Sequence, residues 1–159
     1  MSRLGSPYQQ DDPVEIRFDF LLPYQGWYSN IRPPLLRFEV VSKGKTFPTL
    51  GCVDSGAVGI IMHADVGTQV GLDVYAGREH LVGGIDRELT GYDHPVTISV
   101  PDLDWVTVVE VTFVPGYHRE YALLGREGFL NKWKVAFRDR HQQMYFALEA
   151  ELYTAKRSG

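Results

Sequence analysis

Ten consecutive residues, Trp105–Val114, are almost all β-branched or aromatic (WVTVVEVTFV). Side chains of these types pack well on a pleated, half-buried surface, so the segment predicts a β-strand. Pro115 and Gly116 follow immediately and predict a turn. Upstream, the segments Tyr75–Val82 and Glu88–Val100 flank two glycines and predict a long hairpin with a glycine-rich tip. Long strands joined by tight turns are therefore the main feature that any fold of this chain has to accommodate.

Shorter segments with strand signals occur along the rest of the chain. Val14–Phe20 alternates apolar and charged residues and predicts a half-buried strand, whereas Leu21–Pro34 contains three prolines and predicts an irregular excursion. Two short helices are expected, over His63–Val70 and over Arg126–Trp133. Further strands are expected over Leu35–Val41, Phe47–Val53, Tyr121–Leu124, Lys134–Phe137 and Met144–Leu148. Strand spacings of this kind are typical of a barrel or sandwich, so the expected fold class is all-β.

The chain of 159 residues is 44% hydrophobic and 13% aromatic, which is enough apolar material for one packed core. A mobile arm is expected over residues 1–13, a folded domain over 14–150 and a tail over 151–159. The formal net charge is −4 and no basic patch stands out, which argues against nucleic acid as a partner. No apolar run approaches the roughly 18 residues of a membrane helix, and no signal segment is recognisable. We therefore expect a soluble, cytoplasmic protein without a membrane partner.

An acidic residue directly follows a predicted apolar strand in the segment Cys52–Ala57 (CVDSGA). The triplet Asp-Ser-Gly is also ordinary turn chemistry, so by itself it does not establish a catalytic site. A second segment, Ala122–Arg126 (ALLGR), combines aliphatic residues with a glycine and an arginine just before a predicted helix. Between the two, Leu81–Ile85 (LVGGI) leads into the glycine-rich tip of the predicted hairpin.

In this order, the three segments resemble the motifs of the retropepsin family, the single-lobed aspartic proteases of retroviruses and their cellular and bacterial relatives. The first segment resembles the family's apolar-Asp-Thr/Ser-Gly-Ala motif, the last its apolar-apolar-Gly-Arg-Asp/Asn motif, and the middle one the tip of its flap. The resemblance covers about residues 34–148. It implies a closed acid-protease barrel with a flap hairpin and one short C-terminal helix, and an aspartic endopeptidase that hydrolyses peptides or proteins.

The chemistry of this family explains the residue types. Peptide hydrolysis without a metal or a covalent nucleophile needs a base to activate water and an acid to protonate the leaving amine. Two carboxylates in contact supply both, because like charges so close cannot both ionise and therefore share one proton. The chain carries one Asp motif, whereas a two-lobed enzyme carries two. The resemblance therefore implies a homodimer, without a cofactor, in which Asp54 of each subunit meets its twin on the two-fold axis.

The resemblance also assigns roles to individual residues. Asp54 would act as acid and base, Ser55 would link the two active loops across the dimer axis, and Gly56 would hold the carboxylate through its N–H. Gly125 would let the second aliphatic strand pass closely behind the active loop. The glycines of the hairpin tip would let a flap close over substrate and exclude water. The residues that the resemblance assigns to substrate binding are Ala57, Gly83, Gly84, Ile85 and Arg126.

Two departures from the family pattern bear on activity. Glu127 stands where the family has Asp or Asn, and Val58 stands where retroviral members have an acid that pairs with the arginine. Arg126 is therefore expected to lack its usual partner. These departures leave an alternative open, in which the chain is a non-catalytic dimerisation or peptide-binding module with a retropepsin-like fold.

Other reactive side chains are expected to be structural or solvated. The five histidines show neither the helical pairing nor the clustered spacing of a zinc site, so no metal is expected, although His63 is close to Asp65 in sequence. Cys52 is the single cysteine and lies in an apolar strand, where a buried structural thiol is expected. Asp102 and Asp104 flank a predicted turn and are expected to face solvent.

Overall fold

The computed structural model describes residues 17–26, 32–83 and 87–149. The expected arm over residues 1–13 and the tail over 151–159 lie outside these ranges. One α-helix occurs within them, α1 (Ala64–Gln69), and no helix there is long and apolar enough to cross a membrane. Short 3-10 turns cover Val74–Ala76, Pro101–Leu103 and Asp139–His141. The strands are β1 (Phe20–Pro23), β2 (Leu35–Ser42), β3 (Lys45–Val53), β4 (Ile60–His63), β5 (Arg78–Gly83), β6 (Glu88–Val100), β7 (Trp105–Val114), β8 (Ala122–Leu124), β9 (Trp133–Arg138) and β10 (Gln143–Leu148).

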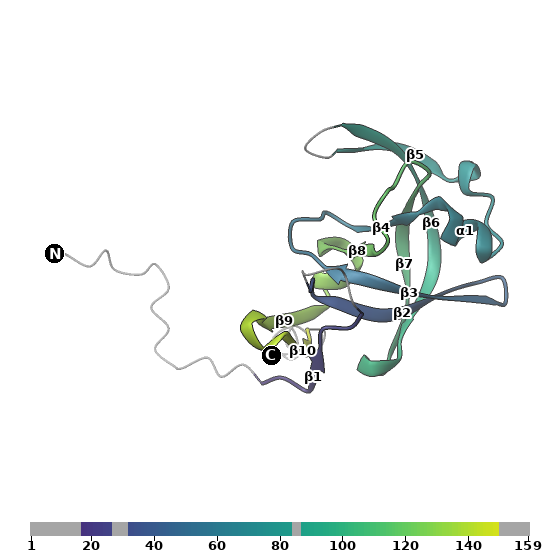
Figure 1. Cartoon of the computed structure of the whole chain (residues 1–159). Coiled ribbons are helices and arrows are strands. Elements are labelled where there is room, and N and C mark those ends of the chain that lie inside the picture. Colours follow the sequence, from purple (N-terminus) through teal and green to yellow (C-terminus); the bar gives the residue numbers. More distant parts are fainter. Residues whose placement is uncertain (1–16, 27–31, 84–86, 150–159) are drawn as a thin grey trace, which may run out of the picture.

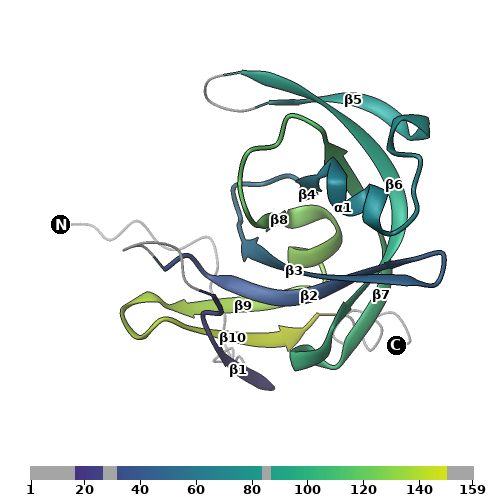
Figure 2. The same cartoon turned by 45° about the vertical axis from the view of Figure 1, so that its right-hand side comes forward.

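Six strands close into a barrel, with neighbours in the order β2-β3-β8-β4-β7-β6 and with β6 pairing again with β2. Most neighbours are antiparallel, but β3 runs parallel to β8 and β4 runs parallel to β7. β5 pairs with the first half of β6, so the β5–β6 hairpin projects beyond the barrel (Figure 1). Figure 2 shows this hairpin arching over one end of the ring of strands. The all-β barrel predicted from the sequence is confirmed. The predicted hairpin is also present, but its first strand begins at Arg78 instead of Tyr75, because Val74–Ala76 forms a 3-10 turn.

The barrel core follows the strand period. Val96, Ile98 and Val100 are buried at alternate positions of β6, as expected for a strand with one covered face. Phe38 of β2 and Phe113 of β7 are almost fully buried in the same cluster. Each such side chain contributes about 1.5–3 kcal/mol through burial alone, so the barrel wall is held mainly by its interior.

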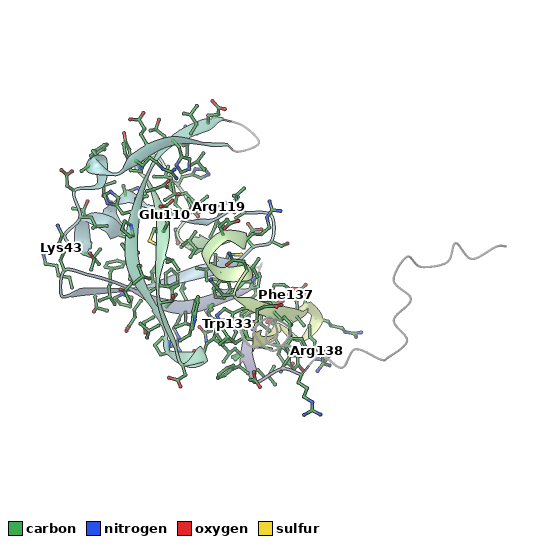
Figure 3. The ribbon with its side chains drawn as sticks, turned by 180° about the vertical axis from the view of Figure 1, so that it is seen from behind. Lys43, Glu110, Arg119, Trp133, Phe137 and Arg138 are labelled. Carbon is green, nitrogen blue, oxygen red and sulfur yellow. The ribbon has the colours of Figure 1, made fainter. Side chains whose placement is uncertain are left out.

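A second, three-stranded antiparallel sheet with the order β1-β10-β9 lies at the end of the barrel away from the hairpin (Figures 1 and 2). Aromatic rings join it to the barrel. The ring centroid of Phe129 lies 6.0 Å from that of Trp105 and 6.4 Å from that of Phe146. Trp133, labelled in this lower part of the molecule in Figure 3, meets Trp105 edge to face at 5.6 Å. Such arrangements are favourable for aromatic rings and close the core at this end.

The first strand differs from its prediction. A strand was expected over Val14–Phe20 and an irregular excursion over Leu21–Pro34, whereas β1 covers Phe20–Pro23. Residues 14–16 lie outside the described ranges. Phe20 and Leu22 pack against the core while Leu21 is exposed, so the alternation continues past the predicted end of the strand.

The helix predicted over Arg126–Trp133 is wrong in length and type. Arg126–Leu130 makes one wide turn, in which the Leu130 N–H donates to the carbonyl of Gly125, five residues earlier. The backbone is extended at Glu127 and has a φ of 93° at Gly128, which a regular helix cannot accommodate. Trp133 begins β9 instead of ending a helix.

Replacing Phe129 by alanine is expected to lower the free energy of unfolding by about 3–5 kcal/mol, because the ring is fully buried between aromatic neighbours. Phe137→Ala is the matched control, since that ring is 45% exposed and its loss is expected to cost about 1 kcal/mol or less. Denaturant unfolding curves of both variants and the parent measure the difference. Equal losses would contradict the assignment of Phe129 to the junction between the two sheets.

Candidate active site

Strand β8 positions Asp54, because it lies between β3 and β4. β8 is parallel to β3, with Leu124 opposite Val53, and antiparallel to β4, with the same Leu124 opposite Ile60. The chain therefore leaves β3 at Val53, crosses the end of β8 and returns as β4. The Asp54 N–H donates to the Leu124 carbonyl at 3.1 Å, so the backbone of the acid is tied to β8.

The loop over residues 54–59, called the active loop below, packs against Gly125. The Gly125 N–H donates to the Gly59 carbonyl at 3.1 Å, and the Arg126 N–H donates to the Ala57 carbonyl at 3.0 Å. A Cβ atom on Gly125 would lie 2.4 Å from the Gly59 oxygen and 2.5 Å from the Ala57 oxygen. Real Cβ atoms do not approach so closely, so this position requires glycine. The structure therefore has the close passage behind the active loop that the sequence predicts.

The Asp54 carboxylate is oriented by its own loop. Its Oδ1 oxygen accepts a hydrogen bond from the Gly56 N–H at 2.8 Å. The Asp54 carbonyl accepts another from the Ala57 N–H at 3.2 Å, which closes a tight turn. The acid is half-buried, whereas Ser55 and Gly56 are exposed at the tip of the turn. Local bonds of this kind fix the direction of the carboxylate without burying it.

Behind the active loop, β3 and the β7–β8 connection place a thiol, two phenols and an arginine close together. Burial and the nearby Asp54 carboxylate raise the pKa of the Cys52 thiol to about 11, so it stays protonated at neutral pH. The Tyr117 hydroxyl donates to the Tyr121 carbonyl at 2.7 Å, and burial raises the pKa of Tyr117. Arg119 donates to the Tyr121 hydroxyl at 3.3 Å. The predicted buried thiol is in fact half-buried, and in its protonated form it is a poor nucleophile.

A cleft of about 820 Å³ opens between the active loop and the β5–β6 hairpin. Its volume is within the range of about 300–1,000 Å³ that is usual for ligand sites. The hairpin whose strand β5 lines this cleft projects from the rim of the barrel (Figure 1). The active loop and β5 contribute Asp54, Gly56, Ala57, Leu81, Val82 and Gly83, among other residues, to its lining.

Charged and polar side chains line the same cleft where the hairpin leaves the barrel. This group, the hairpin-base cluster, comprises Arg78, His80, Asp93, Glu110 and Thr112. Asp93 is its centre, with a side chain that is 4% exposed. Its Oδ1 accepts from the Thr112 hydroxyl at 2.6 Å, and its Oδ2 accepts from Arg78 Nη2 at 2.9 Å. His80 Nδ1 lies 3.0 Å from the same Oδ2. Arg78 Nη2 also reaches Glu110 Oε1 at 3.2 Å, and Figure 3 shows Glu110 below the hairpin.

The charge state of Asp93 follows from these contacts. Burial by itself raises the pKa of the carboxyl, because it disfavours the ionised form. Hydrogen bonds from Thr112 and Arg78, together with the charges of His80 and Arg78, outweigh burial and lower the pKa of Asp93 below its usual value. The hydrogen bond to Asp93 in turn raises the pKa of Arg78. The cluster therefore holds an ionised carboxylate at neutral pH.

The cleft contains part of the predicted site. The predicted residues that line it are Asp54, Gly56, Ala57 and Gly83. Ser55 is exposed beside it, and the predicted tip residues Gly84 and Ile85 lie outside the described ranges. Arg126 is exposed, does not line the cleft and forms no ion pair within the described part of the chain.

Asp102 is exposed, as predicted. Its carboxylate nevertheless accepts a hydrogen bond from Gln25 Nε2 at 2.7 Å and lies 4.0 Å from Arg37 Nη2. Gln25 is buried and needs such a partner for its amide. Asp104 is exposed, as predicted, and has a φ of 48°.

His63 has a structural role at the start of helix α1. Its side chain accepts the Asp65 N–H at 3.0 Å and so caps the first turn of α1. Among residues 17–26, 32–83 and 87–149, no three His, Cys, Asp or Glu side chains lie close enough together to hold a metal ion.

Sequence reasoning missed the hairpin-base cluster. The available signal was a charged residue, Asp93, within a predicted long strand. A carboxylate that becomes buried in a strand needs partners, but the sequence pattern does not show that the face of the strand at Asp93 is covered. The partners themselves come from two other strands and could not be identified from spacing.

Gly125→Ala is expected to lower the free energy of unfolding by about 2–3 kcal/mol, because the new Cβ forces the active loop away from β8. Gly83→Ala is the matched control for stability, since nothing lies within 4 Å of a Cβ at that position. The control is expected to change stability by about 0.5 kcal/mol or less. Thermal unfolding of both variants measures the difference in stability. Equal losses of stability would show that the close passage is not required.

The lowered pKa of Asp93 predicts a specific acid sensitivity. A group whose pKa is lower in the folded state stabilises the fold above its unfolded pKa, about 3.9 for Asp, and loses this contribution as pH falls further. The melting temperature of the parent is therefore expected to fall more steeply below about pH 4 than that of Asp93→Asn, whose amide does not titrate. Asp104→Asn, at an exposed position, should keep the slope of the parent. Parallel curves for the parent and Asp93→Asn would contradict the prediction.

Comparison with known proteins gives no relative from which a function could be transferred. No protein-family model matches the chain, and no curated protein matches it either. A function is therefore inferred from the geometry of the cleft and from the motifs that form it.

Proposed function

We propose that the chain is an aspartic endopeptidase of the retropepsin type, which hydrolyses peptide bonds as a homodimer. The observation that carries this proposal is the setting of Asp54. The acid follows directly on a barrel strand, its backbone is tied to β8, and its side chain lines a cleft of about 820 Å³ beneath a long hairpin. The order of motifs along the chain supports the same activity.

Asp54 is suited to acid–base chemistry on water. The Gly56 N–H holds its Oδ1, whereas its Oδ2 has no hydrogen-bond partner among the described residues. Oδ2 is therefore available to a water molecule or to a second carboxylate. In the proposed reaction, one carboxylate takes a proton from water, which attacks the peptide carbonyl, while the other carboxyl donates its proton to the carbonyl oxygen. The first carboxyl then donates the proton from water to the leaving amine as the C–N bond breaks, and the second recovers its proton from a hydroxyl of the tetrahedral intermediate.

The second carboxylate has to come from another copy of the chain, because each chain carries one Asp-Ser-Gly motif. The tip of the active loop is accessible to such a copy, since Ser55 is exposed and the Val58 side chain is 66% exposed. In a two-fold dimer the same loop meets itself, so a single sequence supplies both members of the pair. Ser55 would then lie next to its own twin across the axis.

The second candidate function is a non-catalytic dimerisation or peptide-binding module. It is favoured by Arg126, which has no ion-pair partner in the described ranges, and by the apolar Val58. Both candidates use the same cleft, and they differ in whether a bound peptide is cleaved.

Asp54→Asn is expected to reduce the rate of peptide cleavage by about a thousandfold or more, because the amide can neither take a proton from water nor share one with its twin. The side chain keeps nearly the same shape, so the melting temperature should stay equal or rise as the repulsion between the two acids disappears. Cleavage of a peptide library between acidic and neutral pH, with and without pepstatin, measures the activity. Melting curves check the fold.

Asp104→Asn is the control for the same substitution at an exposed position and should cleave as fast as the parent. Sedimentation of the parent with pepstatin tests the dimer. If Asp54→Asn cleaves as fast as the parent, the catalytic assignment is wrong. If neither cleaves any peptide but both dimerise, the binding module is the better account.

A further inference from the structure

The outer strand of the hairpin, β5, has little apolar support. It pairs with one strand, β6, from Arg78 opposite Asp93 to Gly83 opposite Glu88. Most of its side chains are exposed, and Leu81 is 62% exposed. An edge strand of this kind is held mainly by its ladder and by specific side-chain contacts. The contacts that β5 makes at its base therefore decide how it lies over the cleft.

Those contacts converge on Asp93. Arg78 and His80 stand two positions apart on β5, so they project from the same face of the strand, and both reach Oδ2 of Asp93. Thr112 of β7 binds the other oxygen, Oδ1. A carboxylate with a 4% exposed side chain thus connects the hairpin to the barrel wall.

These contacts occupy only one nitrogen of the Arg78 guanidinium. Its bonds to Asp93 and Glu110 both leave through Nη2, at 2.9 and 3.2 Å. Nε and Nη1 have no hydrogen-bond partner among the described residues, although the side chain lines the cleft. Because a guanidinium is a rigid fork, fixing one nitrogen also fixes the direction of the remaining donors.

The charges of the cluster determine which kind of hydrogen-bond acceptor can bind to these donors. Arg78 is balanced by two carboxylates, Asp93 and Glu110, so its charge is already paired. A third carboxylate would find no unpaired positive charge here and would lie close to the other two. A neutral acceptor needs only a free donor, and an extended peptide presents such acceptors as unpaired main-chain carbonyl oxygens.

We propose that Arg78 binds a main-chain carbonyl of the peptide under the hairpin, and that Asp93 is a positioning residue that holds Arg78 for this contact. The inference rests on the proposed function, because it takes a peptide as the ligand of the cleft. It adds a recognition site on the hairpin side, separate from the active loop that carries Asp54.

Arg78→Gln is expected to raise the KM of a neutral peptide substrate about tenfold and to leave kcat within about twofold, since a charge-assisted hydrogen bond is lost before the chemical step. The variant Arg78→Lys distinguishes recognition of the peptide from stabilisation of the hairpin. Lysine can still pair with Asp93 but offers no fixed second donor, so KM should stay raised. Recovery of the parent KM by lysine would overturn the recognition role.

The role of Asp93 is tested by a double-mutant cycle. Asp93→Asn turns an acceptor into a donor facing Arg78 and is expected to raise KM several-fold. If Asp93 acts through Arg78, the double variant Arg78→Gln/Asp93→Asn has the same KM as Arg78→Gln alone. A multiplicative rise in KM would overturn the positioning role. Thr112→Val, which removes one hydrogen bond to Asp93, gives a second test with a smaller expected rise if the first variant does not fold.

Glu79→Gln is the matched control on the same strand, because Glu79 is exposed and does not line the cleft. Its KM should equal that of the parent.

Failure of the proposed function can be told apart from failure of this inference by the affinity for fluorescently labelled pepstatin. If the parent binds pepstatin without cleaving peptides, catalysis is excluded, and weaker binding by Arg78→Gln still supports the inference. Equal binding by Arg78→Gln overturns it, and a parent that neither cleaves nor binds overturns both.

Discussion

The candidate site depends on backbone hydrogen bonds between the active loop and the chain that leaves β8. The carbonyls of Ala57, Val58 and Gly59 accept the N–H groups of Arg126, Glu127 and Gly125, respectively. A helix that began at residue 126 would leave these first N–H groups without intrahelical partners. Here the active loop accepts them, so these bonds hold the loop that carries Asp54. The extended backbone at Glu127 and the positive φ of Gly128 then interrupt the expected helix, and only one wide turn forms.

The other wall of the cleft, strand β5, is held by its ladder with β6 and by a buried charge at its base. Burying Asp93 is unfavourable unless several donors surround it, and the donors come from β5 and β7. Breaking these contacts would leave a buried charge unpaired, so the base of the hairpin is expected to stay fixed. The position of β5 over the cleft therefore depends on the ionised state of Asp93.

Local patterns in the sequence predicted the strands well and the contacts between strands poorly. The predicted bounds of Glu88–Val100 and Trp105–Val114 agree with β6 and β7, because these long runs have a clear strand composition. The turn at Asp54 was also foreseen from its motif. The wide turn after Gly125 was not, because the hydrogen bonds that unwind it reach residues almost seventy positions earlier in the chain. Asp93 was missed for the same reason, since its partner Thr112 belongs to another strand.

Asp54 and Asp93, which both line the cleft, differ in how many donors surround them, and this difference suits them to different tasks. Asp93 is surrounded by Thr112, Arg78 and His80, which all favour the ionised form, so its carboxylate is poorly suited to accept a proton. Asp54 accepts one hydrogen bond to its side chain, from the Gly56 N–H, within the described residues, and keeps Oδ2 open. A carboxylate that is to share a proton with a twin needs such an open oxygen, whereas a carboxylate that is to orient an arginine needs a fixed charge. The fold thus gives the proposed chemistry to the acid on the loop and the proposed positioning role to the acid in the wall.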